Sequence, residues 1–252
     1  MIHFVGAGCG AADLITVRGK GLLEAADVIV YAGSLVNPAL LTYKKDGCRV
    51  YDSARMTLEE VLAVMLAAEE QGLDTVRLHT GDPCLYGAIR EQMDELDSRG
   101  VAYDYCPGVS AFSGAAAALK MEYTLPDISQ SVVITRMAGR TPVPERESVR
   151  AFAAHRATMV LFLSTGLLEK TQAELLAGGY SEDTPAAIVY KASWPDERTY
   201  LCAVGTLARC AKENGVSKTA LIIVGDAVSQ SGYARSKLYD PTFTTEFRIA
   251  KE

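Results

Sequence analysis

The first half of the chain alternates short apolar runs with longer amphipathic stretches. Short apolar runs bounded by turn residues predict buried strands, and an apolar period of 3.6 residues predicts helices. Thr57 and Glu60 form a capping box that marks the start of one helix, and Gly72 marks its end. The pattern predicts strands at residues 2–5, 28–36, 74–80 and 101–106, and helices at residues 17–26, 57–72 and 86–99, with a small-residue helix after residue 110.

The second half of the chain repeats this alternation after a break. Residues 121–129 include Pro126 and Asp127 and lack periodicity, so we expect a linker there. Strands are predicted at residues 131–135, 158–163, 186–191, 199–204 and 220–224, and helices at residues 145–154, before Gly178-Gly179 and at residues 206–214. We therefore predict an α/β protein with an N-terminal α/β domain at residues 1–118 and a C-terminal α/β domain at residues 119–252.

Two sharp loops follow neighbouring strands of the first half. Gly81-Asp82-Pro83 comes directly after one strand, and Pro107-Gly108-Val109-Ser110 comes after the next. Gly81 lets the backbone approach a ligand closely, and Pro83 biases Asp82 towards an extended conformation. Alone, Gly-Asp-Pro is an ordinary turn. Because open α/β sheets bind ligands at the carboxyl ends of their strands, the pair of loops favours a binding site.

Composition and charge exclude several classes of protein. The chain has 252 residues, of which 49% are hydrophobic and 22% charged, and its net charge of −6 gives no electrostatic signature of nucleic-acid or anionic-membrane binding. We expect no signal peptide, because the N-terminus lacks a basic segment, and no membrane span, because no apolar run is long enough. The cysteines and histidines lack ligand spacing, so we expect buried thiols in a reducing cytoplasm and no metal.

Residues 6–11, GAGCGA, match the G-x-G-x-x-A pattern of dinucleotide-binding proteins and suggest an NAD-dependent dehydrogenase. That pattern requires a helix directly after the glycines and an acidic residue at the end of the second strand. Here residues 12–16 intervene before the helix, and the nearest acid, Asp27, precedes the second strand. The context therefore disfavours the dehydrogenase.

A longer set of motifs resembles the tetrapyrrole (corrin and sirohaem) methyltransferases. These motifs are VGAGCG with LITVRG at residues 5–19, GDPCLY at 81–86, PGVS at 107–110, ASWPDER at 192–198, GTL at 205–207 and ALIIVG at 220–225. The resemblance extends from Val5 to about Gly225, with one visible departure, because Cys9 replaces a proline that is usual in the family. The segments YAGSLV, at residues 31–36, and TRMAGRTPVPE, at residues 135–145, look like those of the precorrin-4 C11-methyltransferases among this family.

The resemblance implies two α/β domains with a cofactor cleft between them, the tetrapyrrole methylase fold. The implied methyl donor is S-adenosylmethionine, with S-adenosylhomocysteine as the product, and the acceptor is C11 of precorrin-4 or cobalt-precorrin-4 in cobalamin biosynthesis. The chemistry is an in-line displacement in which the protein mainly orients the reactants. Family members generally form homodimers. No general base is evident, and the sequence leaves open whether the acceptor carries cobalt.

Carried over residue by residue, the resemblance also implies the contacts. The donor contacts would be Cys9, Gly81, Asp82, Leu85, Ser110, Ala111 and Phe112 in the first domain, and Leu163, Ser164, Ala192 and Ala220 in the second. The acceptor contacts would be Arg136, Arg140, Tyr31 and Ser34, since a guanidinium can bind the acceptor's carboxylates through two hydrogen bonds. The small apolar residues can equally be core, and the two arginines can equally be solvated.

Other functions stay open at this point. The same fold is similar to that of diphthine synthases and of a ribosomal RNA 2′-O-methyltransferase family, but the acidic balance and the two specific loops argue against an RNA substrate. Another tetrapyrrole C-methyltransferase of the same pathway is an alternative. Outside enzymes, a non-catalytic tetrapyrrole carrier would show the same motifs and no turnover of the donor.

Overall fold

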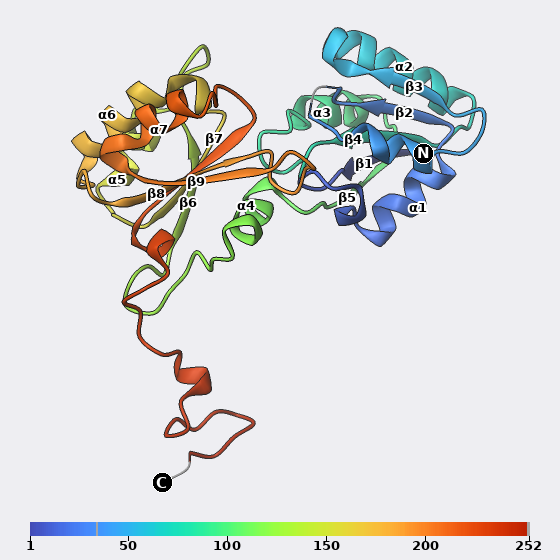
Figure 1. Cartoon of the computed structure of the whole chain (residues 1–252). Coiled ribbons are helices and arrows are strands. Elements are labelled where there is room, and N and C mark those ends of the chain that lie inside the picture. Colours follow the sequence, from blue (N-terminus) through green and yellow to red (C-terminus); the bar gives the residue numbers. More distant parts are fainter. Residues whose placement is uncertain (34, 251–252) are drawn as a thin grey trace. The chain divides into compact units, whose positions relative to one another are not determined.

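The computed structural model describes residues 1–33 and 35–250, which divide into two compact units (Figure 1). Unit 1 comprises Met1–Ala115 and Lys191–Glu197, and unit 2 comprises Ala116–Tyr190 and Arg198–Glu252. The predicted domain limits placed residues 191–197 in the C-terminal domain, whereas their contacts lie in unit 1. A domain boundary after residue 118 stays a prediction.

Unit 1 contains a parallel sheet with the strand order β3-β2-β4-β1-β5. Its strands are β1 (Ile2–Gly6), β2 (Val28–Tyr31), β3 (Arg49–Asp52), β4 (Thr75–His79) and β5 (Tyr103–Cys106). Because all of them run in the same direction, their carboxyl ends share one edge of the sheet. The edge strand β3 was not predicted, since its four residues RVYD form no apolar run.

Helices cover both faces of this sheet. They are α1 (Val17–Ala25), α2 (Leu58–Glu70) and α3 (Arg90–Ser98), with short 3₁₀ turns η1 (Ala12–Leu14), η2 (Pro38–Tyr43) and η3 (Ser53–Arg55). The helix α4 (Ala111–Leu119) follows the loop after β5, and the division between the two units falls within it. One core packs around Val5 and Ile29, and another packs around Phe4 and Val30, whose side chains point to the opposite face. The capping box of α2 is confirmed, with reciprocal hydrogen bonds between Thr57 and Glu60 of 2.8 and 3.3 Å.

The helix predicted at residues 86–99 begins only at Arg90. Tyr86 and Ala88 have φ angles of 58° and 49°, in the left-handed region that a helix cannot contain. A Cβ on Gly87 would also lie 2.9 Å from the carbonyl carbon of Pro83. The chain after Gly81-Asp82-Pro83 is therefore a tight loop of six residues, 84–89, before α3 starts.

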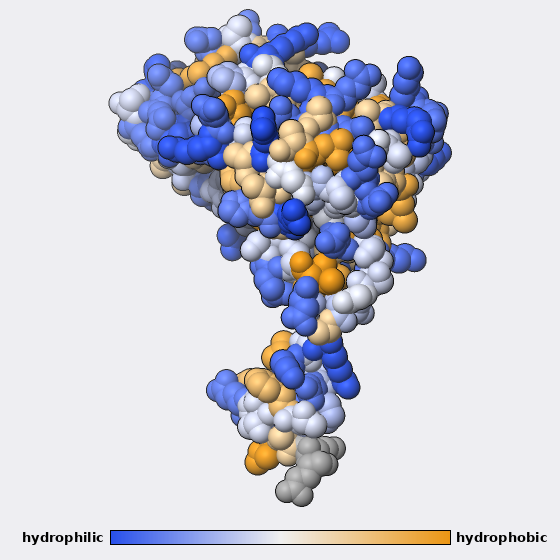
Figure 2. Space-filling model, turned by 90° about the vertical axis from the view of Figure 1, so that its left-hand side faces the viewer, coloured by the Kyte–Doolittle hydropathy of each residue, from blue (hydrophilic) through white to orange (hydrophobic). Residues whose placement is uncertain are grey.

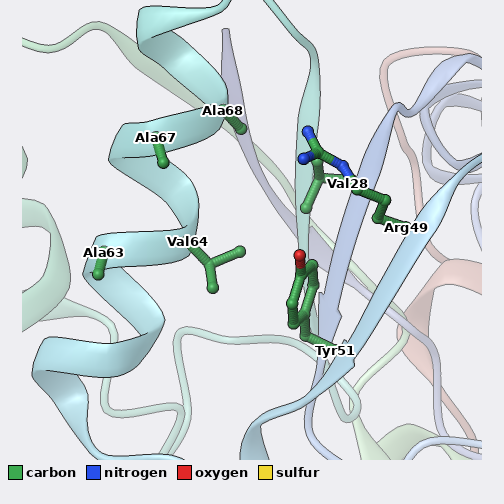
Figure 3. A pocket seen from close by; sticks show the side chains of 7 residues that line it. All are labelled: Val28, Arg49, Tyr51, Ala63, Val64, Ala67 and Ala68. Atoms are coloured by element: carbon green, nitrogen blue, oxygen red, sulfur yellow. The ribbon is translucent and has the colours of Figure 1, made fainter.

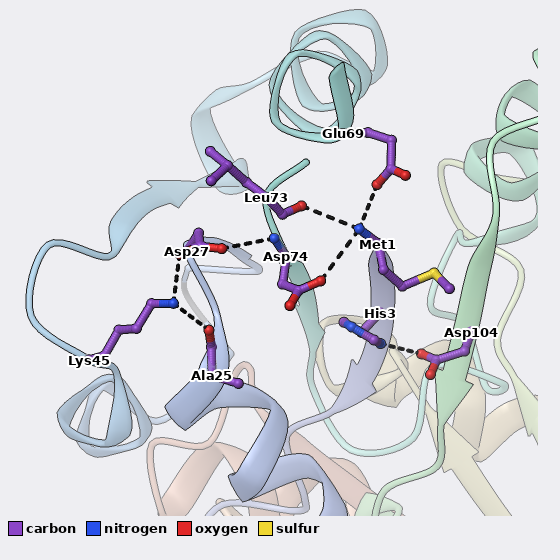
Figure 4. Close-up of polar contacts among 9 residues, drawn as sticks. All are labelled: Met1, His3, Ala25, Asp27, Lys45, Glu69, Leu73, Asp74 and Asp104. Carbon is purple, nitrogen blue, oxygen red and sulfur yellow. Dashed lines mark hydrogen bonds and ion pairs between the residues drawn. The ribbon is translucent and has the colours of Figure 1, made fainter. Parts of the chain in front are cut away.

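The amino edge of the sheet is held by polar contacts (Figure 4). Asp27 accepts a hydrogen bond of 3.0 Å from the Asp74 amide and forms an ion pair of 2.6 Å with Lys45, and the Lys45 hydrogen bond lowers the pKa of Asp27 below its ordinary value. The Met1 ammonium lies 2.7 Å from Glu69 in the same region. Asp27 thus joins strand ends at the edge opposite to the two sharp loops, which removes it as the ribose-binding acid of a dehydrogenase.

Unit 2 contains a mixed sheet with the order β6-β7-β10-β8-β9. Only β6 and β7 are parallel, and the other neighbours are antiparallel. The strands are β6 (Val132–Arg136), β7 (Thr158–Phe162), β8 (Pro185–Tyr190), β9 (Arg198–Ala203) and β10 (Ala220–Val224).

The core of unit 2 lies between this sheet and α5 (Val149–Ala153), α6 (Leu168–Gly178) and α7 (Leu207–Glu213). The helix predicted at residues 145–154 is divided into η4 (Glu145–Glu147) and α5, because the Ser148 side chain caps a new helix by accepting from the Ala151 amide. The remaining 3₁₀ turns are η5 (Thr165–Leu167), η6 (Val204–Thr206), η7 (Asp226–Ser229) and η8 (Lys237–Tyr239).

On the face shown in Figure 2, hydrophobic residues are scattered among hydrophilic ones. In the described part of the chain, every helix is too short or too polar to reach across a bilayer.

Candidate functional site

Three loops meet at the carboxyl edge of the parallel sheet, one after each of β1, β4 and β5. Gly8 and Gly81 form an isolated bridge in which each amide donates to the other residue's carbonyl, at 3.2 and 2.9 Å. A Cβ on Gly108 would lie 2.7 Å from the Cα of Gly6, and a Cβ on Gly6 would lie 2.6 Å from the Gly81 carbonyl oxygen. The three backbones therefore approach so closely that only glycine fits at the junction.

The Asp82 carboxylate connects two of these loops. Its Oδ1 accepts hydrogen bonds from the Cys84 amide, at 2.9 Å, and from the Tyr105 hydroxyl, while its Oδ2 accepts from the Gly108 amide at 3.0 Å. Burial alone would raise the pKa of Asp82, but the hydrogen bonds outweigh it and hold that pKa below its ordinary value. The carboxylate is thus ionised and directed at protein donors.

The other donor contacts predicted in the first half lie around this junction. Ser110 is buried and its carbonyl accepts from the Ser113 and Gly114 amides at the start of α4, where Ala111 and Phe112 are half-buried. A Cβ on Gly81 would lie 3.4 Å from the Ala111 nitrogen, and the Leu85 amide donates to the Asp82 carbonyl at 3.3 Å. The structure therefore brings the predicted residues of these two loops together.

Cys9 and Ala192 belong to the same cluster, although they are far apart in sequence. Cys9 is 5% exposed, and a Cβ on Gly114 would lie 2.8 Å from its Sγ. The same hypothetical Cβ would lie 3.4 Å from the Cβ of Ala192, and a Cβ on Gly10 would lie 2.6 Å from the Ala192 carbonyl oxygen. Ala192 thus lies against the β1 loop within unit 1.

A second cluster forms in unit 2 where β6 and β7 end and β10 begins. The Ser164 hydroxyl accepts from the Met137 amide at 2.8 Å and donates to the Phe162 carbonyl at 2.7 Å, and the Thr165 hydroxyl donates to the Ala220 carbonyl at 2.9 Å. Leu163 has a φ of 52°, and its side chain is 65% exposed. An exposed leucine in a left-handed conformation is strained, and such strain concentrates at functional sites.

The loop after β6 holds the two predicted arginines in different ways. Nη1 of Arg136 donates to the Thr141 carbonyl at 3.3 Å, and Nη2 donates to the Pro142 carbonyl at 2.7 Å. Arg140 is exposed, and no hydrogen bond or ion pair of its side chain occurs within the described residues. Arg136 therefore closes its own loop, which leaves Arg140 as the guanidinium at the tip.

Of the other predicted acceptor contacts, Tyr31 is half-buried at the end of β2, and Ser34 lies outside the described residues. The Tyr31 carbonyl accepts from the Ser53 hydroxyl at 3.0 Å, and the Gly33 amide donates to Asp52 Oδ1 at 3.1 Å. The turn after β3 therefore supports the loop after β2.

Sequence reasoning missed several residues of the candidate site. Tyr105 comes two residues before PGVS and contacts Asp82, and Asn37 donates to the Gly10 carbonyl at 2.8 Å. The only signal for Tyr105 and Asn37 in the sequence is that each lies within two residues of a motif. Thr80, directly before Gly81, has a buried hydroxyl oxygen without a hydrogen-bond partner in the described part of the chain.

One cavity lies apart from these clusters. It has a volume of about 240 Å³, lies between α2 and the strands β2 and β3, and is lined by none of the predicted site residues (Figure 3). Within residues 1–33 and 35–250, no group of three or more His, Cys, Asp or Glu side chains is arranged to hold a metal ion.

Comparison with known families decides between the classes of function. The model of the Tetrapyrrole (Corrin/Porphyrin) Methylases matches residues 1–208. The chain belongs to this family. Membership of this family argues against the dehydrogenase suggested by residues 6–11, and the place of Asp27 at the opposite edge of the sheet agrees with it.

Relatives of this tetrapyrrole methylase cover nearly its whole length. It is 52% identical to the cobalt-precorrin-4 C(11)-methyltransferase of Methanocaldococcus jannaschii over 247 residues, which are 98% of this chain and 95% of that one. A solved X-ray structure of a cobalt precorrin-4 methyltransferase, a cobalamin biosynthetic enzyme, is 46% identical with a TM-score of 0.88, covering 90% and 95% of the two chains. The uroporphyrin-III C-methyltransferase of Thermus thermophilus, solved with S-adenosylhomocysteine, is 27% identical with a TM-score of 0.77, covering 91% and 99%.

Proposed function

We propose that this tetrapyrrole methylase transfers a methyl group from S-adenosylmethionine to C11 of precorrin-4 or cobalt-precorrin-4, a step of cobalamin biosynthesis that releases S-adenosylhomocysteine. The observation that carries the proposal is the similarity to a cobalt-precorrin-4 C(11)-methyltransferase across nearly the full length of both chains. The loops at residues 31–36 and 135–145, which look like those of C11-methylating enzymes, support the same acceptor.

The junction of three loops in unit 1 fits a donor held mainly by backbone groups. Its glycines let three loops converge, which gathers their backbone groups at one edge of the sheet, and the buried Thr80 hydroxyl next to Gly81 has a free hydrogen-bonding capacity in the described chain. The proposed donor contacts there are Cys9, Gly81, Asp82, Leu85, Ser110, Ala111, Phe112 and Ala192. Those proposed in unit 2 are Leu163, Ser164 and Ala220.

The residues of the chain act by binding, orienting and excluding water. S-adenosylmethionine supplies a methyl group on a positively charged sulfur, so the protein does not need to activate it covalently. Rigid loops that place the acceptor carbon in line with the sulfur–methyl bond lower the entropic part of the barrier. The ionised Asp82 adds a negative charge near the proposed donor position, and its hydrogen bonds keep the loops in place.

The loop at residues 135–145 supplies the proposed acceptor site, together with Tyr31 and Ser34. Arg140 is proposed to bind an acetate or propionate of the acceptor, because its guanidinium lies at the loop tip without a protein partner within the described residues. Arg136 then acts through the loop, whose carbonyls it binds.

The protein is further proposed to act in the cytoplasm as a homodimer, without a nucleic-acid or membrane partner. The negative net charge of −6 supports the absence of nucleic-acid binding, and the homodimer rests on analogy with the family. Light scattering at micromolar protein tests the dimer, and a stable monomer would remove it from the proposal.

Mass spectrometry of the tetrapyrrole after incubation with a methyl-labelled donor tests the function. We expect one labelled methyl group on C11, with an equal amount of S-adenosylhomocysteine. Label on another carbon would identify a different tetrapyrrole C-methyltransferase, and tetrapyrrole binding without turnover would identify a carrier. Metal-free and cobalt-containing acceptors, supplied separately, decide which form is the substrate.

A further inference from the structure

The segment Lys191–Glu197, which we name the clip, connects two strands of unit 2 but packs within unit 1. It follows β8 and precedes β9, and its residues 191–197 read KASWPDE. The clip therefore brings side chains from late in the sequence to the β1 loop, where the methyl donor is proposed to bind.

Ser193 forms the central contact of the clip. Its Oγ accepts a hydrogen bond from the Ala11 amide at 3.0 Å and lies 3.3 Å from the Sγ of Cys9, with which it shares a second hydrogen bond. Cys9 is 5% exposed, so its thiol is shielded from competing water. One hydroxyl thus holds both the backbone and a side chain of the β1 loop.

The clip is built to hold Ser193 in this place. Ser193 has a φ of 64°, a left-handed conformation that serine adopts only when its surroundings hold it there. Its amide donates to Glu197 at 2.6 Å, and Lys191 closes the clip through an ion pair of 2.6 Å with Asp196. The strained conformation is therefore fixed by bonds within the clip.

The chain's single tryptophan also lies in the clip and covers the β1 loop. A Cβ on Gly10 would lie 2.6 Å from Nε1 of Trp194, so the indole packs directly against the Gly10 backbone. Its fluorescence is consequently a local reporter of the loop.

We propose that Ser193 and Cys9 are positioning residues for the methyl-donor loop. The Ser193 hydroxyl and the Cys9 thiol fix this loop through their contact with each other and through the bond from the Ala11 amide. The inference rests on the proposed function, because it assumes that residues 8–11 contact the donor. It adds a role for the Ser193 side chain, which acts through the β1 loop.

Calorimetric titration of the full-length protein with S-adenosylhomocysteine tests this inference, with Trp194 fluorescence recorded in parallel. Removing one neutral hydrogen bond typically changes an equilibrium about three- to tenfold, so Ser193→Ala should raise the Kd for S-adenosylhomocysteine by that factor. The KM for the donor should rise to the same extent, while kcat and the KM for the acceptor stay unchanged. Cys9→Ser, which keeps a hydroxyl donor, should retain most of the affinity that Cys9→Ala loses.

Ser148→Ala is the matched control, since the Ser148 hydroxyl also accepts from a backbone amide, at 3.1 Å, but caps α5 in unit 2 and does not hold the β1 loop. It should lower the melting temperature without changing the Kd. Failure of the wild-type protein to bind S-adenosylhomocysteine would overturn the proposed function itself. Two results would overturn only the positioning role, provided that the wild type binds normally. One is a Kd of Ser193→Ala equal to that of the wild type, and the other is the same Kd for Cys9→Ser and Cys9→Ala. If Ser193→Ala does not fold, the pair of Cys9 variants still decides.

Discussion

The Tyr105 hydroxyl donates a hydrogen bond to the Asp82 carboxylate, which belongs to a different loop of the same sheet edge. The Gly108 amide donates to the other oxygen of that carboxylate at 3.0 Å. Asp82 therefore joins the loops after β4 and β5. By fixing the distance between these two loops, it shapes the place where a ligand would bind.

Asp82→Ala is predicted to weaken donor binding more than it weakens folding. The substitution removes the negative charge near the proposed donor position and releases three hydrogen bonds that hold two binding loops. We expect a Kd for S-adenosylhomocysteine that is about tenfold higher or more, and about three- to tenfold higher for Tyr105→Phe, by titration calorimetry.

Tyr103→Phe is the control for this pair. Tyr103 donates to Asp97 at 2.9 Å on an exposed surface, so its replacement removes a similar tyrosine–aspartate bond away from the loops. Its Kd should equal that of the wild type. An unchanged affinity in Asp82→Ala would remove Asp82 from the donor site.

Gly108→Ala is predicted to abolish donor binding in a protein that still folds. The new Cβ would lie 2.7 Å from the Cα of Gly6, a distance that forces the β1 and β5 loops apart. Gly21→Ala, on α1, is the opposite case, because a Cβ there meets nothing within 4 Å and alanine favours a helix by about 0.5–1 kcal/mol. Thermal melting and calorimetry should show a stabilised, binding-competent Gly21 variant and a non-binding Gly108 variant. Donor binding by Gly108→Ala with wild-type affinity would contradict the described junction.

The sequence predicts much of this fold because apolar runs and caps are local signals. The strand at residues 74–80 and the capping box of Thr57 both occur as expected. Failures occur where the backbone conformation departs from what the hydrophobic pattern indicates. Tyr86 and Ala88 lie within an amphipathic pattern, yet their left-handed conformations exclude them from α3.

The candidate site was predictable to the extent that motifs mark loops. GDP and PGVS follow their strands and meet, but Tyr105 and Ser193 carry no motif, and their roles depend on tertiary contacts. The antiparallel pairing of β8 and β9 was available in principle, since residues 191–197 are too few for a crossover between parallel strands. In contrast, the sequence does not indicate that the Arg136 side chain turns back to the carbonyls of its own loop.

The acid stability of the protein is predicted to depend on His79. The side chain is 4% exposed on β4 and stacks on Phe4, and burial together with the nearby Arg77 charge lowers its pKa to about 3. Protonation is therefore resisted in the folded state but occurs in the unfolded chain, whose histidine pKa is 6.5. The contribution of His79 to the unfolding free energy is therefore fully present above pH 6.5, and it is lost as the pH falls from 6.5 towards 3.

Between pH 7 and pH 5 this linkage costs about 2 kcal/mol of unfolding free energy. Urea denaturation measures the loss of unfolding free energy between pH 7 and pH 5. In His79→Leu this loss should be smaller than in the wild type by about 2 kcal/mol. His155→Leu, at an exposed position, controls for the replacement of a histidine by leucine as such. Equal losses in the wild type and the His79 variant would mean that His79 is not the group responsible.

Arg140 and Arg136 are predicted to affect acceptor binding by separate routes. Losing one charge-assisted hydrogen bond costs about 1.5–3 kcal/mol, so Arg140→Ala should raise the KM for the tetrapyrrole roughly ten- to hundredfold and leave donor affinity and melting temperature nearly unchanged. Arg140→Lys should recover only part of the loss, because lysine keeps the charge but not the two-pronged geometry.

Arg136→Ala should also raise the acceptor KM, but with a lower melting temperature, because its guanidinium binds the carbonyls of Thr141 and Pro142 that shape the loop. Arg146→Ala, just beyond the loop and with a side chain 86% exposed, should change neither quantity. Salt separates the two mechanisms further, since screening weakens a contact between Arg140 and a carboxylate but scarcely affects hydrogen bonds from Arg136 to neutral carbonyls. The wild-type KM should therefore rise with ionic strength, whereas that of Arg140→Ala should rise much less. If Arg140→Ala instead lowers donor affinity and leaves the acceptor KM in place, the loop belongs to the donor site, and the assignment of the two ligands is reversed.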